Sequence, residues 1–257
     1  VMKKHQRYFP VFQPDGKLMP YFITIRNGDS RGMDVVTDGN EQVVRARFAD
    51  ANFFIEEDLK HSLEDLLGRL GTLTFQHKLG SMLDKSRRIE AVIAPLADEL
   101  KLTDSEKQAA LRAARLCKAD LVSHMVVEMT SLQGVMGRYY AIHSGETPQV
   151  AQAIFEHYLP RFAGDHIPAE QTGLVLGIAD RLDSLVGLFA AGLAPTGTKD
   201  PFAQRRTALG LVQLLSENDL DFDLDKWMSV VEKGLPIPLS PADRKAFVDE
   251  ALLRLQN

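Results

Sequence analysis

The sequence predicts a mainly α-helical protein that begins with a smaller α+β segment containing a β-hairpin. The first 30 residues hold two aromatic and β-branched runs, "RYFPVFQ" and "LMPYFITIRN", separated by the turn sequence "PDGK". From residue 42 onward, apolar residues recur three and four positions apart, which is the spacing of amphipathic helices. Side chains that commonly start helices stand ahead of several of these segments.

The hairpin is expected to have strands near residues 7–13 and 19–26. Pro10 and Pro20 favour edge positions or strand starts, because proline cannot donate to a sheet ladder. Residues 27–41, "NGDSRGMDVVTDGNE", are polar and rich in glycine, so we expect a loop there. A helix is then expected from Gln42.

The remaining helices are predicted from their start signals. Thr103 and Glu106 have the spacing of a capping box. The other signal is an N-cap residue followed by proline at the first helical position, which occurs at Thr147-Pro148, Asp200-Pro201 and Ser240-Pro241. The expected helices run from Thr103 to about Met129, from Thr147-Pro148 to about Tyr158, through the apolar stretch 172–193, from Asp200-Pro201 to about Leu215, and from Ser240-Pro241 onward.

These elements suggest three parts: an N-terminal α+β segment at 1–75, an all-α domain at 76–234, and the start of a further helical segment at 235–257. The chain begins without a conventional start and stops within a predicted helix. We therefore expect it to be a portion of a longer protein.

The composition is that of an ordinary globular protein, with 45% hydrophobic and 25% charged residues. The sequence holds no apolar run of 18 residues, so no membrane-spanning helix is expected. The net charge of −5 means that any contact with nucleic acid would depend on local basic clusters. Cys117, the single cysteine, is expected on a buried helical face, which suits a cytoplasmic protein.

The stretch "GLAPTGTKDPFAQRR", Gly192 to Arg206, has the glycine spacing of a phosphate-binding loop. That loop, however, needs a preceding strand and the order Lys-Ser/Thr, whereas a helix precedes this stretch and the order is Thr198-Lys199. Asp200 would also place a carboxylate where phosphates should lie. We therefore expect a helix–loop–helix joint here and no nucleotide.

The sequence has seven histidines, and its helical pattern is similar to that of metal-dependent phosphohydrolases of the HD class. Such enzymes need an adjacent His-Asp pair, and none of the seven histidines is followed by aspartate. Asp120 stands where that pair would be expected, and Asp180 or Asp183 stands at the place of the last aspartate. We expect a degenerate site with no metal, although a phosphohydrolase using Asp120, Asp180 and His124 stays open as an alternative.

Three basic clusters are candidate phosphate contacts, since Lys and Arg beside aromatic residues suit RNA backbones and bases. Each could equally be a solvated face. The last cluster is favoured because a capped helix follows its loop. The clusters are Lys3, Lys4, His5 and Arg7; Lys85, Arg87 and Arg88; and Lys199, Arg205 and Arg206.

Several long motifs resemble the beta subunit of bacterial heterotetrameric glycyl-tRNA synthetase, in order and over nearly the whole chain. The most specific are "QGVMGRYYA", "YLPRFAGD" and "PTGTKDPFAQRR". The resemblance implies a central portion of that subunit, with an HD-like helical domain at 76–234 that lacks the phosphohydrolase metal site.

The resemblance also implies how the work is divided. A catalytic alpha subunit would bind ATP and Mg and activate glycine, whereas this chain would carry no catalytic residue and no cofactor and would bind tRNA(Gly) in a complex of two alpha and two beta chains. The expected tRNA contacts are Lys199, Arg205, Arg206, Lys3, Lys4 and Arg7. The remaining alternative is a scaffold between subunits that does not touch tRNA.

Overall fold

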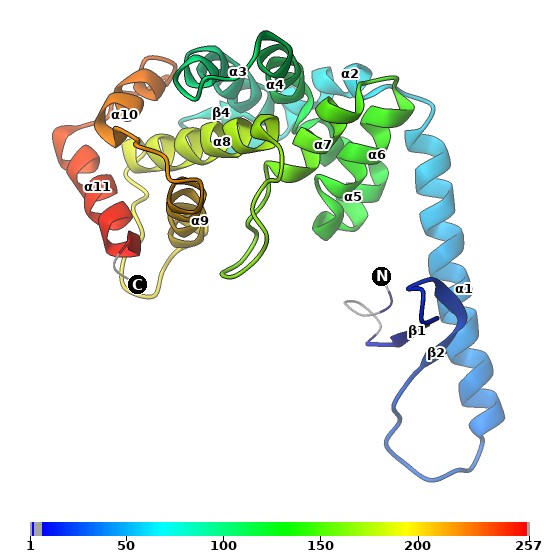
Figure 1. Ribbon diagram of the computed structural model, residues 1–257. Coiled ribbons are helices and arrows are strands. Elements are labelled where there is room, and N and C mark those ends of the chain that lie inside the picture. The colour runs from blue at the N-terminus through cyan, green and yellow to red at the C-terminus, as the bar shows by residue number, and fades with distance from the viewer. Residues whose placement is uncertain (1, 3–6, 256–257) are drawn as a thin grey trace. The chain divides into compact units, whose positions relative to one another are not determined.

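The structure is a computed structural model that describes residues 2 and 7–255, and it divides into two compact units. Unit 1 comprises residues 1–58 and unit 2 comprises residues 59–257 (Figure 1). Residues 59–75, which the sequence analysis grouped with the N-terminal segment, therefore pack within unit 2. Most of the buried apolar side chains belong to unit 2.

Unit 1 is a β-hairpin packed on one long helix. Strands β1 (Phe9–Phe12) and β2 (Leu18–Ile23) pair antiparallel, with Phe9 opposite Ile23. The ring of Tyr8 stacks on Phe22 at 5.0 Å between centroids, and its hydroxyl donates to Asn40 Oδ1 at 2.5 Å. The predicted hairpin is thus confirmed, and a buried aromatic residue ties it to the helix.

The helix of unit 1, α1 (Met33–Asp58), begins earlier than predicted, because residues 33–41 are helical. Val36, Asn40 and Val44 lie one helical turn apart and are among the less exposed positions of this part of α1. Asn40 stands in the middle of that stripe and donates its amide to Val36 O at 2.7 Å. The prediction of a loop was wrong because this polar residue, which bonds within the unit, interrupts the apolar period.

Unit 2 is almost entirely helical, which confirms the predicted mainly α fold. Its only regular strands within the described residues are the short antiparallel pair β3 and β4. In chain order its elements are α2 (Leu63–Leu66), η2 (Leu67–Thr72), β3 (Thr74–Gln76), β4 (Gly80–Ser81), α3 (Met82–Glu99), α4 (Asp104–Leu116), η3 (Ala119–Val122), α5 (His124–Glu128), η4 (Thr130–Leu132), α6 (Val135–His143), α7 (Pro148–Glu156), α8 (Gln171–Ala190), α9 (Gln204–Glu217), α10 (Leu224–Glu232) and α11 (Pro241–Leu255).

Helix α8 is the centre of unit 2. It contacts α3, α4, α7, α9, α10 and α11, and nearly all of its side chains are buried (Figure 1). A helix surrounded in this way needs apolar residues on all sides, which is the composition of its sequence. Any charged residue on α8 is consequently forced into the protein interior.

Several predicted helix starts are confirmed by the bonds at their caps. Thr103 and Glu106 form a complete capping box at α4. Thr147 Oγ1 accepts from Val150 N at 3.3 Å at α7, and Ser240 Oγ accepts from Asp243 N at 3.1 Å at α11.

One predicted helix is broken. The segment expected to run from Thr103 to Met129 ends its first helix at Leu116, turns through η3, and starts again as α5. Ser123 caps α5 by accepting from Val126 N at 3.3 Å, and its hydroxyl also donates to Asp120 O at 2.7 Å. The prediction was wrong because these local polar bonds outweigh the continuing apolar period.

Candidate functional site

The carboxylates of Asp180 and Asp183 on α8 are held by cations from α3. Lys85 Nζ lies 2.9 Å from Asp180 Oδ1 and 3.0 Å from Asp183 Oδ2. Arg88 Nε donates to Asp183 Oδ1 at 2.6 Å. The side chains of Lys85, Arg88 and Asp183 are buried, so these pairs lie in a medium where an unpaired charge would be costly.

A second lysine completes this buried ion network. Lys118 Nζ lies 2.8 Å from Asp180 Oδ2 and 2.9 Å from His157 Nε2. His157 Nδ1 lies 2.7 Å from Ile154 O, so this nitrogen carries the hydrogen and Nε2 accepts from the lysine. Lys118 lies 62 residues from Asp180 in the sequence and Lys85 lies 98 residues from Asp183, so lysines distant in the chain neutralise these aspartates.

The electrostatics of the network follow from burial and from its two ammonium groups. Burial alone would raise the pKa of Asp180, but Lys118 and Lys85 hold it well below its ordinary value. Burial, followed by the Lys118 ammonium, holds the pKa of His157 well below its ordinary value. The network therefore contains an ionised aspartate and a neutral histidine at neutral pH.

Arg181, the neighbour of Asp180 on α8, has a different role. Its guanidinium donates to the backbone carbonyls of His157 at 2.9 Å, Leu159 at 2.7 Å and Pro160 at 3.1 Å. These carbonyls lie just beyond the end of α7, where they have no helical partner. Arg181 thus fixes the path of the chain between α7 and α8.

Asp120 is buried near this network, close enough for the Lys118 charge to act on it, but it forms no ion pair with a described residue. Its Oδ2 accepts from Gly134 N at 2.6 Å and from Gly137 N at 3.1 Å, so it caps the start of α6 from a distant part of the chain. Its Oδ1 has no hydrogen-bond partner among the described residues, and burial raises its pKa to about 6. Asp120 is therefore a helix cap and no member of an Asp180 pair.

This arrangement does not suit a phosphohydrolase metal site. In the described part of the chain, no group of three or more His, Cys, Asp or Glu side chains could hold a metal ion. The ammonium groups of Lys85 and Lys118 occupy the oxygens of Asp180, and a lysine cation there would repel a divalent ion. Asp180 and Asp183 are thus neutralised within the fold, whereas Asp120 caps α6.

The stretch 192–206 forms the predicted joint between α8 and α9. Gly192, with φ of 76°, follows the end of α8, and Thr196 and Lys199 exchange backbone bonds across a tight turn. Gln204 Nε2 donates to Leu193 O at 2.5 Å and ties the two ends of the joint together.

Asp200 caps α9, but from a different place than predicted. The helix begins at Gln204 instead of Pro201, and Asp200 accepts from Gln204 N at 2.8 Å and from Arg205 N at 3.0 Å. Ala203, at φ of 53°, makes the turn that brings the carboxylate there. This carboxylate uses the free amides of the helix start, so phosphate has no place at them.

The three basic residues of this joint face outward. Lys199 and Arg206 are exposed and Arg205 is half-buried. None of the three forms an ion pair with a described carboxylate, so their charges are available to a partner. The structure thus brings the three predicted contacts to one short surface segment.

The other predicted basic residues divide differently. Lys3 and Lys4 lie outside the described residues, and Arg7 is exposed with φ of 56°. In the "DKSRR" cluster, the interpretation as a surface patch was wrong for two of three residues. Lys85 and Arg88 belong to the buried network, and only Arg87 is exposed.

Sequence reasoning missed the roles of Lys85, Lys118 and His157. A signal was present for Lys85 and Arg88, because they precede Ile89 and Val92 on the apolar stripe of α3. A cation at such a position has to meet a buried anion. Nothing in the local sequence pointed to Lys118 or His157.

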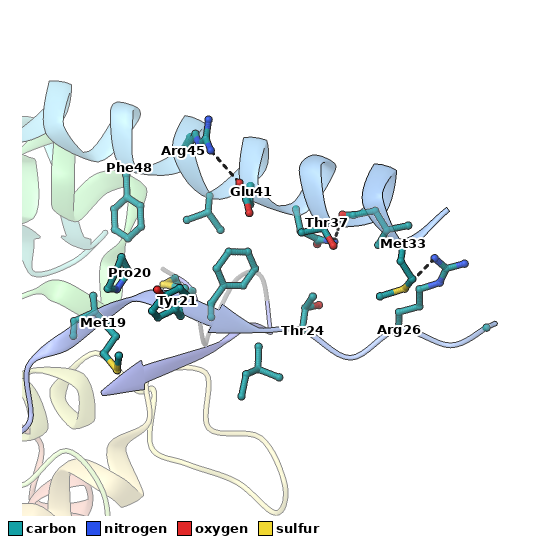
Figure 2. Close-up of a pocket in the computed structure, with 18 of the residues that line it drawn as sticks. Met19, Pro20, Tyr21, Thr24, Arg26, Met33, Thr37, Glu41, Arg45 and Phe48 are labelled. Atoms are coloured by element: carbon teal, nitrogen blue, oxygen red, sulfur yellow. Dashed lines mark hydrogen bonds and ion pairs between the residues drawn. The ribbon is translucent and has the colours of Figure 1, made fainter. Parts of the chain in front are cut away.

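Unit 1 has a separate open groove of about 950 Å³ between β2 and α1 (Figure 2). Phe48, Pro20 and Met33 lie along it, and Arg26 at its edge approaches Met33 Sδ at 3.7 Å. Its described lining includes no histidine or cysteine. The groove has a mainly apolar lining, with Arg26, Asp29, Glu41 and Arg45 as its charged residues.

Comparison with known proteins identifies the class of protein. The sequence model of the family described as "Glycyl-tRNA synthetase beta subunit" matches residues 1–255. Relatives named "Glycine--tRNA ligase beta subunit" come from Clostridioides difficile (strain 630), 52% identical over 87% of this chain and 32% of that protein, and from Desulforamulus reducens, 50% identical over 91% and 34%. A third, from Halothermothrix orenii, is 46% identical over 97% of this chain and 36% of that protein.

The chain belongs to the family of glycyl-tRNA synthetase beta subunits. It spans about a third of the length of the curated relatives it matches. Among the helices of the described residues, none is both long and apolar enough to cross a membrane.

Proposed function

We propose that this chain is a tRNA-binding region of a glycyl-tRNA synthetase beta subunit. In the whole protein it supports the ATP-dependent attachment of glycine to tRNA(Gly), and a catalytic alpha subunit binds ATP and Mg. The complex contains two alpha and two beta chains and acts in the cytoplasm. This chain supplies RNA contacts and no catalytic residue.

The observation that carries the proposal is the basic joint between α8 and α9. Lys199 and Arg206 are exposed, and they and Arg205 lack carboxylate partners among the described residues. Asp200 and Gln204 fix the backbone around them through the bonds described above. Cations held on a rigid backbone lose little freedom when they meet a phosphate, which favours binding.

The same geometry bears on the alternatives. A phosphohydrolase would need the oxygens of Asp180 free for a metal, and two lysines hold them. A pure scaffold would have no use for unpaired cations at a rigid joint. The experiment must therefore distinguish tRNA binding from a scaffold role without RNA contacts.

The test replaces Lys199, Arg205 and Arg206 with alanine together in the full-length beta subunit, assembled with its alpha subunit. Affinity for tRNA(Gly) is measured at several salt concentrations. Loss of three phosphate contacts should weaken binding and reduce the slope of log affinity against log salt by about 2 to 3. The matched control removes Lys17, Arg31 and Lys245, which pair with surface carboxylates.

Unchanged affinity and slope in the triple variant, with tRNA still bound by the parent, would contradict the assignment of these residues. If the parent complex aminoacylates tRNA while this region makes no contribution to binding, the scaffold alternative holds. Aminoacylation rates of the same variants at saturating tRNA would separate weaker binding from damage to the complex.

A further inference from the structure

A row of alternating aromatic rings and arginines crosses α6, α7 and the segment after α7. It consists of Tyr139, Arg138, Phe155, Arg161 and Tyr158, and we refer to it as the arginine–aromatic ladder. The guanidinium carbon of Arg138 lies 5.4 Å from the ring centroid of Tyr139 and 4.7 Å from that of Phe155. Arg161 lies 5.5 Å from Phe155 and 6.0 Å from Tyr158.

The two helices that build the ladder pack against each other (Figure 1). One end of the ladder reaches the ion network, because Lys118 Nζ lies 4.5 Å from the centroid of the Tyr158 ring. The other end is open, because Tyr139 is 56% exposed. Phe162, which directly follows Arg161, is 62% exposed. The ladder thus leads from the core of unit 2 to exposed aromatic rings.

The two arginines of the ladder form no ion pair with a described carboxylate. Within the described chain, Arg138 and Arg161 donate only to neutral oxygens, Gln152 Oε1 at 3.3 Å and Gln133 O at 3.2 Å. The nearby carboxylate of Asp165 accepts instead from the backbone amides of Arg161 and His166, each at 2.9 Å.

Two other arginines of unit 2 form ion pairs. Arg112 pairs with Glu64 and Glu146, and Arg244 pairs with Asp225 and Glu232. In the ladder, by contrast, two guanidinium groups lie near one phenylalanine ring and neither has an ion-pair partner among the described residues. Both guanidinium groups can therefore pair with an anion supplied by a partner.

We propose that the arginine–aromatic ladder binds unpaired nucleotides of an RNA. The guanidinium groups of Arg138 and Arg161 contact phosphates, and the exposed rings of Tyr139 and Phe162 stack on bases. Stacking on aromatic rings combined with cationic contacts to the backbone is the chemistry by which single-stranded RNA is recognised. A duplex would offer phosphates but no free base faces.

This inference rests on the proposed function and adds a second surface to it, separate in sequence from Lys199, Arg205 and Arg206. The two segments that carry it, "QGVMGRYYA" and "YLPRFAGD", hold no residue that the sequence analysis assigned to RNA. A protein partner, such as another subunit, is the competing occupant of this surface.

The experiment uses the full-length beta subunit, assembled with the alpha subunit, and a tRNA(Gly) transcript. The charge variant is R138Q/R161Q, and the stacking variant is Y139A/F162A, with Y139F as the ring-preserving control. R31Q/R45Q is the matched control for charge, because it removes two surface arginines that pair with carboxylates. Melting temperatures show whether each variant is folded.

The charge variant should bind tRNA about tenfold more weakly and reduce the salt slope by about 1.4, the value for two phosphates of a single strand. The stacking variant should also weaken binding about tenfold, but with an unchanged salt slope, because stacking releases no counter-ions. Y139F and R31Q/R45Q should bind as the parent does. A single-stranded RNA 12-mer should compete for the parent better than a fully paired duplex of the same length.

Parental affinity in both ladder variants, while K199A/R205A/R206A weakens binding, would overturn the ladder and leave the proposed function intact. A parent complex that does not bind tRNA(Gly) would overturn both. If the ladder variants instead lose assembly with the alpha subunit in sedimentation without RNA, and bind RNA normally, the surface belongs to a protein partner and the inference is wrong.

Discussion

Lys118 and Asp180 form an ion pair inside unit 2, with 2.8 Å between Nζ and Oδ2 and side chains only 4% and 14% exposed. The lysine comes from the turn after α4, whereas the aspartate is on α8, so the pair joins two parts of the core. Lys118 also lies 2.9 Å from His157 Nε2. One ammonium group therefore contributes to the charge state of both Asp180 and His157.

The first prediction concerns this pair. Lys118→Met should lower the free energy of unfolding by about 3 to 5 kcal/mol, because it leaves part of a buried carboxylate without its partner. Urea unfolding followed by circular dichroism measures the change. The control is Lys107→Met, which breaks the pair of Lys107 with the exposed Asp98 and should cost less than about 1 kcal/mol. Equal costs for the two variants would mean that Lys85 alone neutralises Asp180.

The way this pair forms shows what the sequence could and could not predict. Starts of α4, α7 and α11 were predicted because a capping side chain and the amide it binds lie three residues apart. The ion network joins residues 39 to 98 apart in sequence. Which residues pair in the network depends on how α3, α4 and α8 pack, and this packing cannot be predicted from a single sequence.

The errors at helix starts have a related cause. Asp200 was correctly recognised as a capping residue, but it reaches Gln204 N because Ala203 adopts a left-handed conformation. A capping hydrogen bond that spans four residues and depends on a left-handed residue has no regular spacing that the sequence would reveal. In α1, similarly, the hydrogen bond from Tyr8 to Asn40 joins residues 32 apart in sequence. A polar position of the helix thereby contacts the hairpin, and no local pattern predicts it. The HD-like designation of residues 76–234 stays a prediction.

The second prediction concerns two buried groups with opposite effects on stability between about pH 4 and 6. The pKa of Asp120 is raised to about 6 by burial, so its contribution to stability is full below about pH 4 and is lost as pH rises through 6. The pKa of His157 is lowered well below 6.5, so its contribution is full above pH 6.5 and is lost as pH falls. Each changes the free energy of unfolding by up to about 1.4 kcal/mol per pH unit, and the two oppose each other.

In the parent, the effects of these two groups on the free energy of unfolding should therefore nearly cancel between about pH 4 and 6. Asp180 does not interfere, because its lowered pKa places its loss of stability below pH 3.8. Asp120→Asn should leave a stability that rises with pH, whereas His157→Gln should leave one that falls with pH. Urea unfolding at half-unit steps of pH gives the slopes. Parallel curves for parent and both variants would show that neither group titrates differently in the folded chain.

The third prediction tests the packing around Asp120. Gly134, at the start of α6, has φ of 75°, and a Cβ there would lie 2.5 Å from Tyr158 Cδ2. Gly145, just after α6, has φ of 82°, but a Cβ there would meet no atom within 4 Å. Both glycines share the conformational strain that an L side chain would bring, and only Gly134 adds a collision with an aromatic ring.

Gly145→Ala should cost about 1 to 2 kcal/mol of unfolding free energy, the strain of the left-handed conformation alone. Gly134→Ala should cost about 1 to 3 kcal/mol more, because the ring of Tyr158 is held against Lys118 and cannot withdraw without moving the ladder. Thermal and urea unfolding of the two variants give the comparison directly. If the two alanines cost the same, Tyr158 moves aside freely, and the ring is then not the rigid link between the ion network and the ladder that the distances describe.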